Sequence, residues 1–225
     1  MIPDWLQPLV DAIPTVTGEH FTRFLPPAEG GRQSAVLVLF GEGTEGPDLL
    51  LIERAATMRS HAGQPAFPGG ALDPEDDGPV AGALREAQEE VGLRPDSVDV
   101  LGVLPALYLP PSGFVVHPVV GWWREPHEVG VVDAAEVASV VRVPLAELTD
   151  PENRFRITHV SGLIGPAFDA GGLMVWGFTA GLIAGILTLA GWERDWDKNR
   201  LRELDAETLR LALKTWERPV SPIEG

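Results

Sequence analysis

The chain has 225 residues, enough for one well-buried domain with a short terminal appendage. Its formal net charge of −16 argues against nucleic acid or an anionic membrane as the main partner, because both need a basic surface. There is no cysteine, and the opening residues lack the basic region of a secretory signal. We therefore expect a cytoplasmic protein.

The chain predicts one mixed α+β domain. The first 31 residues end in the proline- and glycine-rich LPPAEGG and favour an N-terminal helix and loop. Residues 55–78 read as a loop, and residues 139–149 as a strand that leads into a short helix. Prolines in the later strands suggest edges or bends. Four apolar runs predict strands: residues 34–40, 48–54, 98–107 and 114–123.

An uncharged segment at residues 171–192 is long enough to span a bilayer. It contains six glycines, has acidic flanks and is not followed by a second candidate span. We therefore expect a buried core helix at about 173–190, since a helix that is apolar all round belongs inside a protein. A charged helix at about 203–216 follows, and it packs against either the domain or a second subunit of a homodimer.

The helix predicted at residues 79–91 is well delimited. Pro79 occupies a favoured first position, and Gly92 ends the helix. A narrow apolar stripe repeats with helical spacing and should pack on a core: Val80, Leu84, Ala87 and Val91.

The same helix concentrates negative charge at Glu86, Glu89 and Glu90. Like charges at this spacing cost roughly 0.2–0.5 kcal/mol per pair, and carboxylates near a helix C-terminus also oppose the helix dipole. Arg85 can offset one of them through an i, i+4 contact with Glu89. Because hard divalent cations prefer carboxylate oxygens, this pattern predicts a metal site that is shared with substrate phosphates.

The run Arg85-Glu86-Ala87-Gln88-Glu89-Glu90-Val91-Gly92-Leu93 resembles the signature helix of the Nudix hydrolases. Upstream, Arg85 comes 15 residues after Gly70, one more than in the common Nudix spacing, and Asp76 stands where that pattern has glutamate. This expansion, together with the segment from Leu50 to Gly70, resembles the coenzyme A pyrophosphatase branch.

The resemblance implies a Nudix α/β/α sandwich around a mixed β-sheet, at residues 32–192. Residues 1–31 would then form an N-terminal helix and loop, and residues 193–225 a charged C-terminal helix and tail. It also implies hydrolysis of coenzyme A, or of a derivative, to 3′,5′-ADP and 4′-phosphopantetheine with Mg²⁺ or Mn²⁺.

By the same resemblance, Glu86 and Glu90 are metal ligands, and Glu89 is a third ligand or the group that orients water. Arg85 would buttress the glutamates, and a Gly69 or Gly70 carbonyl would approach the metal. The residues leave the general base open between Glu89, Glu128 and Glu136.

Arg54 and Arg59 are the candidate phosphate-binding residues, since a guanidinium matches phosphate oxygens. The alternative is a purely structural role, in which Arg54 ends a strand and pairs with an acidic neighbour. Of the histidines, His61 is the better active-site candidate, and His117 the better core or strand residue.

Two other functions compete with coenzyme A hydrolysis. One is a Nudix pyrophosphatase for ADP-ribose or another nucleoside diphosphate derivative. The other is a non-catalytic nucleotide-binding regulator, against which the three intact glutamates argue.

Overall fold

The structure is a computed structural model that describes residues 1–21, 26–27, 30–58, 61–110, 112–158, 162, 164–204, 206 and 208–210. The α-helices in these ranges are α1 (Gln7–Ala12), α2 (Gly78–Val91), α3 (Leu145–Thr149) and α4 (Gly177–Leu189). Single 3₁₀ turns lie at Ile13–Thr15, Gly18–His20, Pro95–Ser97 and Pro151–Asn153.

Twelve strands are distributed over two sheets within the described residues. The larger sheet holds β1 (Arg32–Gly43), β2 (Gly46–Arg54), β3 (Pro65–Ala66), β4 (Gly69–Ala71), β5 (Val98–Val103), β6 (Leu107–Leu109), β7 (Phe114–Trp123) and β8 (Val137–Pro144). The smaller sheet holds β9 (Arg154–Thr158), β10 (Ile164–Ala170), β11 (Leu173–Val175) and β12 (Leu201–Arg202).

The larger sheet is mixed, as predicted. Its main path runs β3-β2-β1-β7-β5, and β1 and β7 are parallel while the other pairs are antiparallel. The predicted strand at 98–107 is in fact β5 followed by β6, and the two pair with different parts of β7. Pro118 lies in β7 where its partner changes from β6 to β5, so this proline marks a change of pairing inside the sheet rather than an edge.

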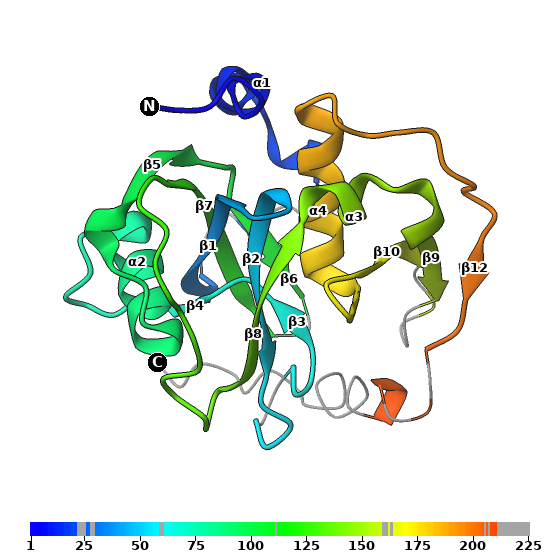
Figure 1. The fold of residues 1–225 in the computed structure, drawn as a ribbon. Coiled ribbons are helices and arrows are strands. Elements are labelled where there is room, and N and C mark those ends of the chain that lie inside the picture. The colour runs from blue at the N-terminus through cyan, green and yellow to red at the C-terminus, as the bar shows by residue number, and fades with distance from the viewer. Residues whose placement is uncertain are drawn as a thin grey trace.

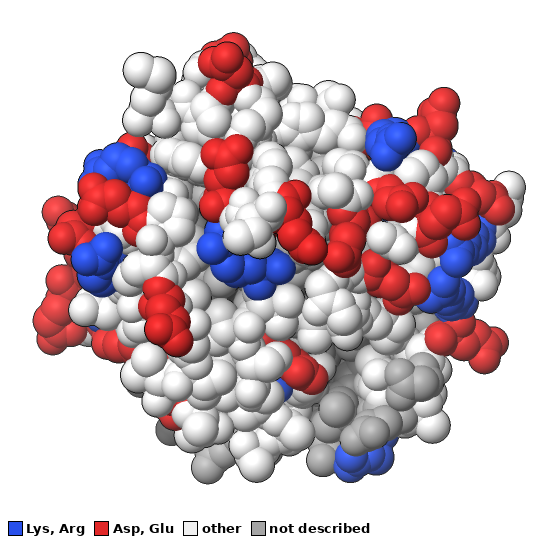
Figure 2. All heavy atoms as spheres, in the orientation of Figure 1, with Lys and Arg blue, Asp and Glu red and all other residues white. Residues whose placement is uncertain are grey.

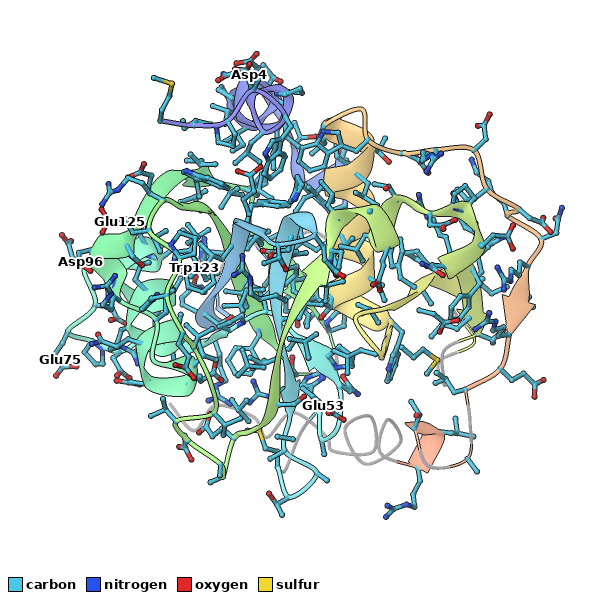
Figure 3. All side chains as sticks on the ribbon, in the orientation of Figure 1. Asp4, Glu53, Glu75, Asp96, Trp123 and Glu125 are labelled. Atoms are coloured by element: carbon cyan, nitrogen blue, oxygen red, sulfur yellow. The ribbon has the colours of Figure 1, made fainter. Side chains whose placement is uncertain are left out.

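Helices cover both faces of this sheet (Figure 1). In β1, Leu37 and Leu39 pack in the cluster that includes α2, whereas Val38 and Phe40 pack with α4. Successive residues of a strand point to opposite faces, so a continuous apolar run is what a strand buried on both sides requires. Trp123, labelled in Figure 3, is almost fully buried in the α2 cluster.

The region after residue 150 differs from the prediction. The segment expected to be a helix at 173–190 begins as β11 and becomes helical only at Gly177, because Leu173–Val175 pairs with β10. Helix α4 is nevertheless buried, as expected. Within the described ranges, no helix combines the length and the apolar character needed to cross a membrane.

The structure modifies one further prediction and leaves most of another outside the described residues. The loop expected at 55–78 also contains the short strands β3 and β4. The helix expected at about 203–216 falls largely outside the described residues. The three-part division at residues 31 and 192 remains a prediction.

Candidate active site

Helix α2 begins and ends close to the predicted points. Asp77 is its N-cap, Pro79 lies in its first turn, and Gly92 ends it in the left-handed conformation with φ of 72°. A residue with a Cβ would be strained at that φ. Its apolar stripe is buried against the sheet, as predicted, and this fixes which side chains of α2 face β4.

The glycines of β4 allow α2 to approach the sheet closely. A Cβ on Gly70 would lie 2.5 Å from the carboxylate of Glu86, and a Cβ on Gly69 would overlap the carbonyl of Ala35. Gly69 also has φ of 153°, which side-chain-bearing residues rarely adopt. Gly70 therefore makes room for the Glu86 carboxylate, and Gly69 allows the close approach of β1.

Glu90 is buried, with 2% of its surface exposed, rather than lying on a solvated helix face. Its Oε2 accepts a hydrogen bond from the backbone N–H of Gly69 at 2.9 Å. Its Oε1 has no hydrogen-bond partner among the described residues and lies 3.8 Å from Nη1 of Arg54. Burial raises the pKa of Glu90 to about 7, and the charges of Glu86 and Glu136 add to this, while the Gly69 bond and Arg54 oppose it.

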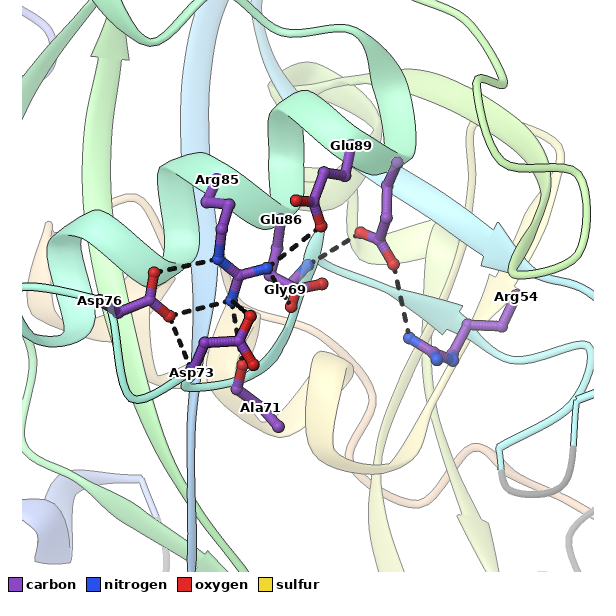
Figure 4. Close-up of polar contacts among 9 residues, drawn as sticks. Arg54, Gly69, Ala71, Asp73, Asp76, Arg85, Glu86 and Glu89 are labelled. Carbon is purple, nitrogen blue, oxygen red and sulfur yellow. Dashed lines mark hydrogen bonds and ion pairs between the residues drawn. The ribbon is translucent and has the colours of Figure 1, made fainter.

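Arg85 is the centre of a hydrogen-bond network (Figure 4). Its Nε and Nη2 donate to the two carboxylate oxygens of Asp76 at 3.0 and 2.9 Å. Its Nη1 donates to Glu86 at 2.9 Å and to Glu89 at 3.1 Å, and Nη2 also donates to the carbonyl of Ala71 at 3.2 Å. This geometry fits the predicted buttressing role, because one guanidinium holds two of the three glutamates.

Asp76 was noted in the sequence only as a departure from the expected glutamate, and no role was predicted for it. Its paired hydrogen bonds with Arg85 lower the pKa of the Asp76 carboxyl and raise that of Arg85. The shorter acid therefore still reaches the arginine. The position of Asp76 relative to Gly70 and Arg85 was the signal that could have found this contact.

Arg54 ends β2, and its contact with Glu90 brings together two residues that lie far apart in the sequence. Arg59 lies outside the described residues. His61 has φ of 55°, and its Nδ1 lies 3.0 Å from Oε1 of Gln64. Burial lowers the pKa of His61; the bond to Gln64 opposes this, and the charge of Arg54 adds to it. His117 lies in β7, as predicted.

The three candidate bases differ in position. Glu89 is on α2, with its side chain 60% exposed and bound to Arg85. The charge of Glu136 raises the pKa of both Glu86 and Glu90. Glu128 lies on the loop that precedes Glu136 and is exposed.

The donor set suits a hard divalent cation, because it consists of carboxylate oxygens and includes the buried Oε1 of Glu90, which accepts no hydrogen bond from the described residues. No three His, Asp or Glu side chains within the described ranges already converge on one point that would hold a metal ion. The physical reason is visible in the contacts: Arg85 holds Glu86 and Glu89, while Glu90 is turned toward Gly69.

A family model for the NUDIX domain matches residues 31–161, which is more than half of the chain. The chain belongs to the Nudix family. The Nudix hydrolase NudL of Cronobacter sakazakii is 53% identical over 116 residues, covering 52% of this chain and 59% of that protein. NudL of Citrobacter koseri is 47% identical over 134 residues, covering 60% of this chain and 64% of that protein.

The matched part therefore spans less than two thirds of the length of either curated relative. Among solved structures, the Nudix hydrolase RenU from M. smegmatis superimposes with a TM-score of 0.51 over 76% of this chain and 92% of its own. At 18% sequence identity, this likeness bears on the fold alone. It agrees with the predicted Nudix fold, a mixed sheet with helices on both faces.

Proposed function

We propose that this Nudix chain is a metal-dependent hydrolase that cleaves the diphosphate of coenzyme A, or of a derivative, to 3′,5′-ADP and 4′-phosphopantetheine or its acyl form. The observation that carries the proposal is the carboxylate cluster of α2, with a buried Oε1 of Glu90 that lacks a hydrogen bond and lies beside Arg54. A buried carboxylate oxygen without a partner is costly unless a cation binds it.

Glu86, Glu90 and Glu89 would hold Mg²⁺ or Mn²⁺. A bound ion of this kind neutralises the charge of a diphosphate and lowers the pKa of a bound water. Arg85 keeps Glu86 and Glu89 in place through its bonds to Asp76. Arg54 supplies a guanidinium for a phosphate oxygen at the same point.

The coenzyme A assignment is supported by where the branch-like segment lies. This segment, Leu50 to Gly70, runs from β2 to β4 and contacts α2 at both ends: Arg54 lies 3.8 Å from Glu90, and the Gly69 N–H donates to Glu90. Two residues of this segment, Arg54 and Gly69, therefore adjoin the proposed metal ligand Glu90, which supports a role for the segment in substrate binding.

The overall charge agrees with a metal-assisted reaction on a small anion. Acidic side chains are spread over the face shown in Figure 2, and basic groups there are fewer. Such a surface repels nucleic acid and anionic membranes, so local attraction for a diphosphate has to come from a metal ion and from single arginines.

Product analysis by mass spectrometry tests the proposal. The protein is incubated with coenzyme A, or with ADP-ribose in parallel, in the presence of Mg²⁺, Mn²⁺ or EDTA. We expect metal-dependent release of 3′,5′-ADP and phosphopantetheine, strongly reduced in Glu86→Gln. The matched control is Glu125→Gln, which removes an exposed carboxylate that pairs with Arg124.

Cleavage of ADP-ribose alone would refute the coenzyme A assignment and keep the metal site. If neither compound is cleaved under any metal condition, the hydrolase proposal fails for both, and the regulator becomes the better reading. A nucleotide-binding titration would then measure binding directly.

A further inference from the structure

The loop between β7 and β8 is docked on the C-terminal end of α2. The N–H of Gly130 donates to the carbonyl of Val91 at 3.1 Å, and the N–H of Val132 donates to the carbonyl of Glu90 at 3.0 Å. Carbonyls in the last turn of a helix have no partner within the helix, so these bonds satisfy them. The loop is thereby fixed to the same turn of α2 that carries Glu90.

The end of this loop is fixed to β2 beside Arg54. The N–H of Ala55 donates to the carbonyl of Glu136 at 2.8 Å, and Val137 pairs with Arg54 just after a register shift in the β2–β8 ladder. Such irregularities redirect side chains and are common next to active sites. Glu136 is therefore held at the point where Arg54 approaches Glu90.

Glu136 is half-buried, and its backbone is bonded to Ala55, the residue that follows Arg54. Arg54 in turn lies 3.8 Å from Glu90, one of the proposed metal ligands. Within the described residues, no Arg or Lys lies within ion-pair distance of Glu136. Glu136 is thus held beside Arg54 without an ion pair to a described cation.

We propose that Glu136 is the general base of the hydrolysis, an inference that rests on the proposed function. A water oxygen attacks one phosphorus of the diphosphate and forms a new P–O bond, while the bond from that phosphorus to the bridging oxygen breaks. The water proton passes to a carboxylate oxygen of Glu136, and the bridging oxygen leaves with its electron pair on the other phosphate.

The other two candidates fit this role less well. Glu89 shares the Nη1 of Arg85 with Glu86, so its Oε2 already accepts a hydrogen bond and is not free to accept the water proton. Glu128 lies earlier on the same loop as Glu136 and is exposed. Of the two loop glutamates, Glu136 is half-buried, and its carbonyl accepts the hydrogen bond from Ala55 at the end of β2.

The test compares Glu136→Gln with Glu128→Gln, a matched change on the same loop. Steady-state kinetics use whichever of coenzyme A and ADP-ribose the wild-type protein cleaves, at saturating Mn²⁺. Affinity for Mn²⁺ without substrate is measured by electron paramagnetic resonance, and thermal melting checks folding. For Glu136→Gln we expect kcat to fall by about 10²- to 10⁴-fold, the usual range for loss of a general base. Its Mn²⁺ affinity should stay within about twofold of wild type, and Glu128→Gln should match wild type in both.

Three results would overturn the inference. A kcat for Glu136→Gln within about threefold of wild type would show that no essential proton passes to this group. A parallel loss of Mn²⁺ affinity, or of folding, would make Glu136 a ligand or a structural residue instead. Complete inactivity of the wild-type protein would refute both the proposed function and the role of Glu136. In the first two results the wild-type protein is active, so only the role of Glu136 is refuted.

Discussion

The buried carboxyl of Glu90 predicts an unusual dependence of stability on pH in the metal-free protein. Burial holds its pKa near 7 in the folded state, against an ordinary value of 4.5 in the unfolded chain. Above pH 4.5 the unfolded state releases this proton while the folded state keeps it. The contribution of Glu90 to stability is therefore lost progressively as pH rises from 4.5 to about 7, and it stays constant above that.

The size of the effect follows from the two pKa values. Each pH unit in this window costs roughly 1.4 kcal/mol, so the whole window is worth about 3 kcal/mol. Glu90→Gln keeps the shape of the side chain and its acceptor for the Gly69 N–H, but it has no proton to lose. The difference in unfolding free energy, variant minus wild type, should rise by about 3 kcal/mol between pH 4.5 and 7.5.

The measurement is urea unfolding in EDTA at half-unit steps from pH 4.5 to 8.5. Glu89→Gln is the control, because it makes the same change on the same helix at a side chain that is 60% exposed rather than buried. Adding Mn²⁺ at pH 8 should stabilise wild type more than Glu90→Gln, since a cation relieves the buried charge. If the difference in unfolding free energy between wild type and Glu90→Gln does not change with pH, the reasoning is refuted.

Three further predictions concern the residues around the carboxylates. Asp76→Ala removes the hydrogen bonds that the Nε and Nη2 of Arg85 donate to Asp76. In steady-state kinetics kcat should fall about 10-fold with KM little changed. An unchanged kcat would argue against the role of Arg85 in holding the glutamates. Gly70→Ala places a Cβ 2.5 Å from the Glu86 carboxylate and should cost about 1–3 kcal/mol in urea unfolding, together with weaker Mn²⁺ binding. Wild-type Mn²⁺ affinity in that variant would contradict the close approach. Arg54→Lys loses the planar fork, so KM for the diphosphate substrate should rise about 10-fold more than kcat falls; a pure kcat effect would place Arg54 away from substrate.

The sequence was sufficient for the elements whose signal is local. Strands β1, β2 and β7 appear as long apolar runs, because a strand covered on both faces has no polar side to interrupt the run. Helix α2 has its own start and stop residues and an apolar stripe, so its range needed no knowledge of its neighbours. The carboxylate cluster was visible for the same reason, since residues three and four apart on a helix are adjacent.

The tertiary structure decided the features that depend on contacts between distant segments. Strands β9 and β10 were not predicted, and β11 was assigned to the helix, because each is defined by its pairing partner rather than by a continuous apolar run of its own. Neither the burial of Glu90 nor its contact with Arg54 can be read from the α2 pattern, since both depend on β2 and β4 closing over the helix.

The choice among Glu89, Glu128 and Glu136 shows the same limit at the site. All three are glutamates on or after α2, and nothing in their local sequence separates them. The docking of the β7–β8 loop on α2 and β2 distinguishes them, through backbone hydrogen bonds that any sequence can make. Local periodicity thus determined where the charge gathers, and long-range packing determined which charges face each other.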